Sequence, residues 1–311
     1  MTGFEVTPGG PFDLANQNSY FGGWPTVGDA VAMAFPVEGW KSSAAVLVRQ
    51  AGALVTGEVH GPTGAEAERA WHQALAALSL DVDGAGYPEV GRRDPAIGRL
   101  QEEYRFVRPV LFHSPYEAAC GFTIGHRLSI AQARRTRREI ADIHGEVFEF
   151  RDNTLHAFPT PGQLLKLDSL PGVAEAKIER LHAFARAAMD GWLTREWLRS
   201  VPQQEALTRL ETLPGIGPFF SQGILFRGAG LADAMPDDDL TVRAVRAACG
   251  LPDGAGAAEA LARAERWRPY RMWACVQLHV WFRSQPGATQ GLRGGGTERG
   301  RTRGRTTDRQ G

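Results

Sequence analysis

Apolar and polar residues follow two different periodicities along the chain, and the change falls near residue 110. Two β-prone runs at 44–48 and 53–59 are separated by Gln50-Ala51-Gly52, which predicts a β-hairpin. An alanine-rich segment at 66–78 has its apolar residues at helical spacing. A polar, glycine-rich stretch then leads to the change in pattern. Strands, a hairpin and one helix indicate a small α+β domain over residues 1–110.

Helical periodicity continues almost without interruption after residue 114. The sequence Ser114-Pro115-Tyr116-Glu117 combines a capping residue, a proline at the first helical position and a glutamate at the third. Short glycine and proline turns separate the later segments. We therefore predict a compact all-helical domain over residues 111–285, so the fold class is mainly α. Its expected helices cover 129–144, a segment opening at 160, 173–189, 203–213, 219–226, 240–249, 257–267 and 270–282.

Charge is distributed unevenly along the chain, although it sums to zero. The 311 residues contain 35 Lys and Arg against 35 Asp and Glu, so the total does not suggest a nucleic-acid partner. Residues 286–311 concentrate six arginines among glycine and threonine, with Glu298 and Asp308 as the acidic residues. This segment has almost no apolar residues to offset the entropy of ordering it. We predict a disordered, arginine- and glycine-rich tail.

The three cysteines, Cys120, Cys249 and Cys275, are far apart and odd in number. Their spacing fits neither a zinc site nor an iron–sulfur cluster, and small apolar core residues in a reducing compartment are the expected role. The first residues lack a basic region followed by an apolar stretch, and no run of eighteen apolar residues occurs. We expect a soluble, cytoplasmic monomer with no membrane partner, close to the nucleoid if the source is bacterial.

The sharpest local signal is Leu213-Pro214-Gly215-Ile216-Gly217-Pro218, between two predicted helices. Gly215 and Gly217 allow a tight turn that leaves backbone N–H groups uncovered, while Ile216 would plug the turn into the core. Such a turn can hold a DNA phosphate without reading the base sequence. Taken alone, the same motif also fits an ordinary turn between helices.

Further motifs follow this turn in a fixed order. Arg227-Gly228 and then Pro236-Asp237-Asp238-Asp239-Leu240 come after it, and Trp267-Arg268-Pro269-Tyr270-Arg271 lies nearer the end. Together with Phe112 to Ala118 and Phe158 to Pro161, they resemble the helix-hairpin-helix DNA glycosylases, most closely the 3-methyladenine DNA glycosylase II branch. The resemblance spans roughly residues 75 to 283. It implies a glycosylase domain that binds damaged double-stranded DNA, extrudes the lesion and removes the base, the first step of base excision repair.

The resemblance places the catalytic carboxylate at Asp238, with Asp237 or Asp239 capping the following helix. Without the resemblance, a capping role would be the better interpretation of all three. Bifunctional members of the superfamily carry a lysine two residues after the second hairpin glycine, and that position is Phe219 here. The resemblance therefore implies hydrolysis of the glycosidic bond without strand cleavage.

The substrate pocket implied by the resemblance contains Phe219, Gly223, His279 and Trp281. Phe219 and Gly223 stand where the branch commonly has a tryptophan and a tyrosine, which suggests a roomier pocket that stacks less tightly on a base. We expect activity on cationic alkylated purines, whose bond to the sugar is already labile. A glycosylase for an oxidised or bulky base remains an alternative, and His279 also fits a purely structural role.

The residues implied to fill the gap left by the extruded base are His126 and Arg127. A solvated arginine at a helix end is the alternative for Arg127, and a surface charge run is equally consistent with the arginines that follow, Arg134, Arg135, Arg137 and Arg138. No organic cofactor is implied. In the superfamily, the hairpin carbonyls often hold a monovalent cation, here those of Leu213 and Ile216. A non-catalytic DNA-binding protein on the same scaffold is the remaining alternative. Asp238 argues against it, because an acidic side chain beside DNA would not favour the binding of phosphates.

Overall fold

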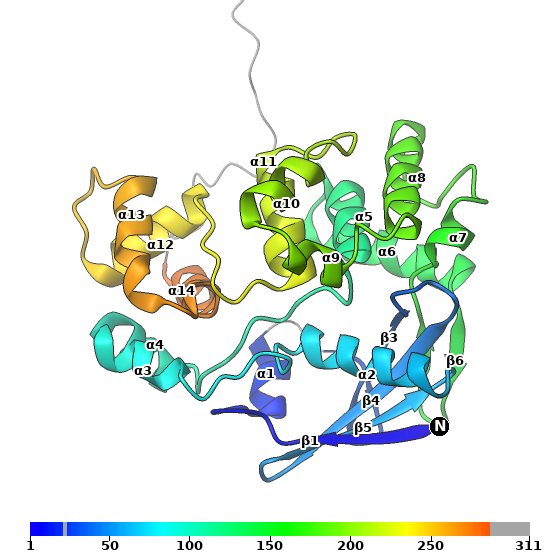
Figure 1. Cartoon of the computed structure of the whole chain (residues 1–311), viewed down its shortest axis with the longest axis horizontal. Helices are drawn as coiled ribbons and strands as arrows, with labels where there is room; N and C mark the ends of the chain where they lie inside the picture. Colours follow the sequence, from blue (N-terminus) through cyan, green and yellow to red (C-terminus); the bar gives the residue numbers. More distant parts are fainter. Residues whose placement is uncertain (21–23, 287–311) are drawn as a thin grey trace, which may run out of the picture.

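The structure is a computed structural model that describes residues 1–20 and 24–286. It combines an antiparallel sheet with two groups of helices (Figure 1). The mainly helical architecture with α+β structure at the N-terminus confirms the predicted fold class. The predicted tail lies, beyond Pro286, outside the described residues. No helix in the described part is both long and apolar enough to cross a membrane.

The sheet has five strands in the order β1-β5-β4-β3-β2, with neighbouring strands antiparallel. The predicted hairpin is confirmed: Ala51 pairs with Leu54 across a turn in which Gly52 has φ +59°. The sequence pattern missed β3 because its residues are buried on both faces, so apolar and polar positions do not alternate. The strands are β1 (Thr2–Val6), β2 (Thr26–Val27), β3 (Ala30–Pro36), β4 (Ser43–Ala51) and β5 (Leu54–His60).

Both faces of the sheet are covered. The helix α2 (Ala65–Ala77) packs on one face, where Trp71 lies so close to Gly57 that a Cβ there would be 2.2 Å from the indole ring. Phe148 and Leu155 cover part of the other face, from the short hairpin of β6 (Val147–Glu149) and β7 (Thr154–His156). That hairpin interrupts the region predicted to be all helical.

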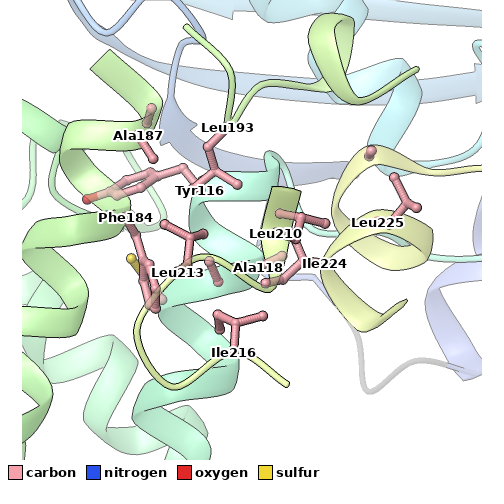
Figure 2. Close-up of a cluster of buried hydrophobic side chains, with 14 of the residues drawn as sticks. Tyr116, Ala118, Phe184, Ala187, Leu193, Leu210, Leu213, Ile216, Ile224 and Leu225 are labelled. Atoms are coloured by element: carbon pink, nitrogen blue, oxygen red, sulfur yellow. The ribbon is translucent and has the colours of Figure 1, made fainter. Parts of the chain in front are cut away.

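A first group of helices surrounds the core shown in Figure 2. Tyr116, Phe184, Leu210 and Ile224 are fully buried in it. The expected starts at Ser114, Ser129 and Thr160 are confirmed, since each side chain accepts a hydrogen bond from the third residue of its helix. These helices are α5 (Pro115–Gly125), α6 (Ile130–His144), α7 (Pro161–Leu164), α8 (Glu175–Met189), α9 (Arg195–Ser200), α10 (Gln203–Leu210), α11 (Pro218–Gly223) and the π-helical turn η1 (Ile224–Ala229).

A second group of helices combines residues 239–284 with residues 87–107. Tyr87, Ile97 and Leu100 share one core with Trp267 and Trp273. The expected domain boundary near residue 110 therefore does not divide the packing, because α3 and α4 pack with the C-terminal helices. The elements are α3 (Tyr87–Arg93), α4 (Pro95–Glu103), α12 (Asp239–Cys249), α13 (Ala257–Ala264), η2 (Glu265–Trp267) and α14 (Arg271–Ser284), while α1 (Leu14–Tyr20) lies beside the sheet.

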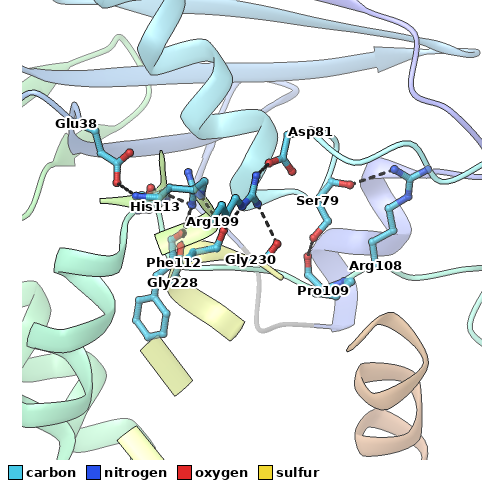
Figure 3. A network of polar contacts seen from close by, with 12 residues as sticks. Glu38, Ser79, Asp81, Arg108, Pro109, Phe112, His113, Arg199, Gly228 and Gly230 are labelled. Carbon is cyan, nitrogen blue, oxygen red and sulfur yellow. Dashed lines mark hydrogen bonds and ion pairs between the residues drawn. The ribbon is translucent and has the colours of Figure 1, made fainter. Parts of the chain in front are cut away.

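A buried polar network joins the sheet to the helices (Figure 3). The Arg195 guanidinium, only 7% exposed, donates to the carbonyls of Phe112, His113, Gly228 and Ala229 at 3.1–3.3 Å. Its backbone N–H donates to the Glu38 carboxylate at 3.0 Å. Burial raises the pKa of Glu38, and the nearby arginine opposes that shift. Arg195 thereby fixes the segment before α5 against the end of η1.

Candidate active site

The loop between α10 and α11 has the predicted hairpin geometry. Gly215 has φ +80°, a conformation that favours glycine, and Ile216 is 5% exposed in the core. The Ile216 N–H donates to the Leu213 carbonyl at 3.1 Å, which closes the turn. Gly215 and Gly217 are exposed, and nothing lies within 4 Å of a Cβ built on Gly217. The backbone of the turn therefore faces open space at Gly217.

Asp238 is the N-cap of α12, and both of its carboxylate oxygens are held. Oδ1 accepts the backbone N–H of Thr241 at 3.1 Å, and Oδ2 accepts the Thr241 hydroxyl at 2.9 Å. The expectation that Asp237 or Asp239 caps this helix is therefore wrong. Those two side chains are exposed, one bound to the Gln222 amide at 3.0 Å and the other near Arg243. Of the three carboxylates, only Asp238 is half-buried.

His279 in α14 extends this arrangement. Its Nε2 atom lies 3.0 Å from the Thr241 hydroxyl oxygen and 3.5 Å from Cys275 Sγ. Because the hydroxyl proton is donated to Asp238, Nε2 of His279 carries the hydrogen and donates to the hydroxyl oxygen. Burial lowers the pKa of His279 to about 4, against the opposing effect of Asp238, so the imidazole is neutral at pH 7. The chain of donors runs from His279 through Thr241 to Asp238.

A cavity of about 640 Å³ opens between α5, the start of α6 and α11. Its aromatic lining comes from Trp24, Phe112, Phe122, Phe219 and Phe220. Phe219 is 55% exposed, so its ring is available to a ligand. Cationic side chains line the same cavity, namely Arg127, Arg134, Arg137 and Arg227.

Three of the predicted pocket residues do not line this cavity. A Cβ on Gly223 would lie 2.6 Å from the ring of Phe122, which stacks on Phe220 with centroids 5.5 Å apart. The space expected at Gly223 is thus filled by another aromatic ring. Trp281 packs beside Phe282 against the C-terminal core, and His279 adjoins Thr241 instead.

The loop after α5 separates the two residues expected to enter the duplex. His126 is half-buried and meets the Phe220 ring edge-on, with centroids 5.8 Å apart. Burial and then neighbouring cations lower the pKa of His126. Arg127 is exposed and has φ +65°, so it projects from a turn. Arg127 is therefore better placed than His126 to reach into DNA.

Comparison with known proteins decides the family relationship. The chain is 28% identical to DNA-3-methyladenine glycosylase 2 of Escherichia coli over 214 residues, which are 68% of this chain and 71% of that protein. It is 32% identical over 212 residues to a probable bifunctional transcriptional activator/DNA repair enzyme AlkA of Mycobacterium tuberculosis. That match covers 66% of this chain and 40% of the relative. The chain is thus similar in sequence to DNA-3-methyladenine glycosylases. No family model matches it.

Solved structures agree on the fold of this chain. The 3-methyladenine DNA-glycosylase from Archaeoglobus fulgidus superposes with a TM-score of 0.72 at 18% identity, over 91% of this chain and 98% of that one. An 8-oxoguanine glycosylase/lyase of Clostridium acetobutylicum, in complex with double-stranded DNA, gives a TM-score of 0.65 at 17% identity. That match covers 88% of this chain and 92% of that one. The helix-hairpin-helix glycosylase fold is thus shown.

Two site residues were missed from sequence. Thr241 follows Asp238 by three residues, the spacing of an N-cap and its partner, so its contact could have been anticipated. Arg227 was noticed only as part of a motif, yet it lines the cavity and donates to the Val110 carbonyl at 2.6 Å. The helix that carries Phe219 also connects the cavity to the loop of Asp238, because the Gln222 amide donates to the Asp237 carboxylate at 3.0 Å.

Proposed function

We propose that the chain is a monofunctional DNA glycosylase that excises alkylated purines with Asp238 as its catalytic carboxylate. The main support for this proposal is the Asp238 carboxylate, which is half-buried and accepts a hydrogen bond from Thr241 on each of its two oxygens. An acid that only capped a helix would need one such contact. The hairpin between α10 and α11, the Asp238 carboxylate and the aromatic cavity all belong to one chain. A monomer is therefore sufficient for the proposed activity.

The chemistry requires a fixed negative charge. When the bond between C1′ and the base nitrogen breaks, its electron pair leaves with the base and positive charge develops on the sugar. A preorganised carboxylate stabilises that charge without having to reorient. Water then forms the new bond to C1′ and loses a proton, with Asp238 well suited to orient it. Thr241 and His279 act as positioning residues behind the carboxylate.

DNA is held in this proposal by the exposed hairpin backbone at Gly215 and Gly217, while Arg127 occupies the gap left by the extruded nucleotide. Among the residues that the structure describes, Ile216 alone donates to the Leu213 carbonyl, so an oxygen lone pair remains for a cation. A monovalent cation held by the Leu213 and Ile216 carbonyls would bridge the hairpin to a phosphate.

The substrate class we propose is the cationic alkylpurines. Four arginines line the cavity, so the cavity has no electrostatic attraction for a cationic base. The aromatic faces stack on any purine, and a cationic lesion gains its advantage from its own labile bond. Excision should therefore be fast for 3-methyladenine and N7-methylguanine and slow for hypoxanthine.

The test is single-turnover excision from duplex oligonucleotides that carry alkylated, deaminated or oxidised bases. If hypoxanthine or an oxidised purine is the best substrate, the lesion class is wrong and the glycosylase proposal stands. If no base is released from any duplex to which the protein binds, a non-catalytic DNA-binding protein is the better description.

The reaction should leave intact abasic strands that break only after treatment with alkali or heat. Phe219 has no nucleophilic group with which to form a Schiff base. The measurement is borohydride trapping during excision, analysed by denaturing electrophoresis. A covalent protein–DNA adduct would contradict the absence of lyase activity.

Thr241→Val should slow excision about tenfold without weakening DNA binding. The change removes the hydroxyl donor of Asp238 Oδ2, and a hydrogen bond to a charged group contributes roughly 1.5–3 kcal/mol. Thr241→Ser keeps the hydroxyl and should restore most of the rate. Comparing single-turnover rates for both variants checks this role, and equal rates for valine and serine would remove Thr241 from the mechanism.

A further inference from the structure

A group of basic side chains lies between the hairpin and the loop after α5. Lys177 and Arg180 are three residues apart in α8, so they project from the same face of that helix. The Lys177 ammonium donates to the carbonyls of Ile124 and His126 at 3.0 and 3.1 Å. Lys177 is thereby fixed beside the loop that carries Arg127.

Arg180 connects this group to the hairpin. Its Nη1 atom lies 2.6 Å from the position that a Cβ would take on Gly215, and its Cζ atom lies 2.9 Å from it. The guanidinium therefore covers the turn at the glycine with φ +80°. Next to it, a cavity of about 540 Å³ is lined by Arg180, His182, Arg186 and Pro214, with Ala176 and Glu179 completing the wall.

The positive charge of this group is not compensated within the part of the chain that the structure describes. No described carboxylate lies within 4.0 Å of the charged nitrogens of Arg127, Lys177 or Arg180. Arg199, by contrast, is paired with Asp81 at 2.6 Å. Burial and then the charges of Arg180 and Arg127 lower the pKa of Lys177. Unpaired cations this close together favour an anionic ligand.

We propose that Lys177 and Arg180, referred to below as the α8 cation group, bind successive phosphates of one DNA strand beside the hairpin. The inference rests on the proposed function for its ligand, and it adds side-chain contacts to those of the hairpin backbone. A strand held at the hairpin runs past Arg180 toward Arg127. The α8 cation group thus aligns the strand with the loop that enters the duplex.

The test is the salt dependence of binding to an undamaged duplex, followed by fluorescence anisotropy between 50 and 200 mM NaCl. Arg180→Ala should lower the slope of log Kd against log salt by about 0.9, the value for one lost phosphate contact on duplex DNA. Arg180→Lys keeps the charge and should keep most of the slope. Arg99→Ala is the matched control, because it removes one exposed arginine from α4 in the second helix group.

A wild-type slope in a folded Arg180→Ala variant would overturn the inference, and so would an equal loss of slope in Arg99→Ala. A melting temperature for each variant establishes that it is folded, and Lys177→Gln provides a second position with the same expectation. Because undamaged duplex is used, the result does not depend on excision. Failure of the wild type to release any base would refute the proposed activity and leave the slope comparison intact.

Discussion

Asp238→Asn should lower the single-turnover rate of base excision by roughly a hundredfold or more, the scale of removing one electrostatic stabiliser. The amide keeps the shape of the side chain, and its oxygen can still accept the Thr241 N–H. Its nitrogen cannot accept the Thr241 hydroxyl, and the negative charge opposite the sugar is lost. Affinity for DNA should change little, because the hairpin and the α8 cation group are untouched.

The measurement compares base release with duplex binding for the same protein preparation. Asp237→Asn and Asp239→Asn are matched controls, since both side chains are exposed and each variant removes the same charge from the same loop. Both controls should excise at nearly the wild-type rate. Near-normal excision by the Asp238 variant, with a large loss in one of its neighbours, would move the catalytic role to that neighbour.

Arg195→Met should lower the free energy of unfolding by about 3–5 kcal/mol, as when one member of a buried polar pair is removed. The variant removes the guanidinium shared by four carbonyls, of which those of Gly228 and Ala229 are buried and those of Phe112 and His113 half-buried. It also removes the positive charge nearest to Glu38, whose pKa burial already raises. The affected backbone carries Phe112, which lines the cavity.

Urea denaturation followed by tryptophan fluorescence gives the free energy of unfolding. Arg209→Met is the matched control, because Arg209 is exposed and stacks on Trp192 at 4.5 Å from the ring centroid. Such a surface contact contributes about 1 kcal/mol or less. Similar losses in the two variants would show that the carbonyl contacts of Arg195 contribute little to stability.

Local signals in the sequence predicted local structure well. The caps at Ser114, Ser129 and Thr160 depend on neighbours within three residues, so spacing alone was enough. The helix expected over 203–213 ends at Leu210, because the chain turns there into the hairpin.

Errors arose where distant residues decide the outcome. Gly223 was expected to leave space, but Phe122 from α5 fills it. His279 was proposed for the pocket or for a structural role, and its contact with the hydroxyl of Thr241, 38 residues earlier, was not anticipated. The helices α3 and α4 were not predicted, since their apolar partners Trp267 and Trp273 lie far along the chain. No local periodicity contains this information.

The shared core of α3, α4 and the C-terminal helices has a consequence for biosynthesis. The ribosome delivers α3 and α4 long before Trp267 and Trp273, so Tyr87, Ile97 and Leu100 emerge without the surface that buries them. Contacts this distant in sequence form slowly, and exposed apolar side chains on a nascent chain invite aggregation or chaperone binding. A fragment that stops at residue 110 would leave the side chains of Tyr87, Ile97 and Leu100 exposed to solvent. The second helix group can therefore complete its core only after α14 has been synthesised.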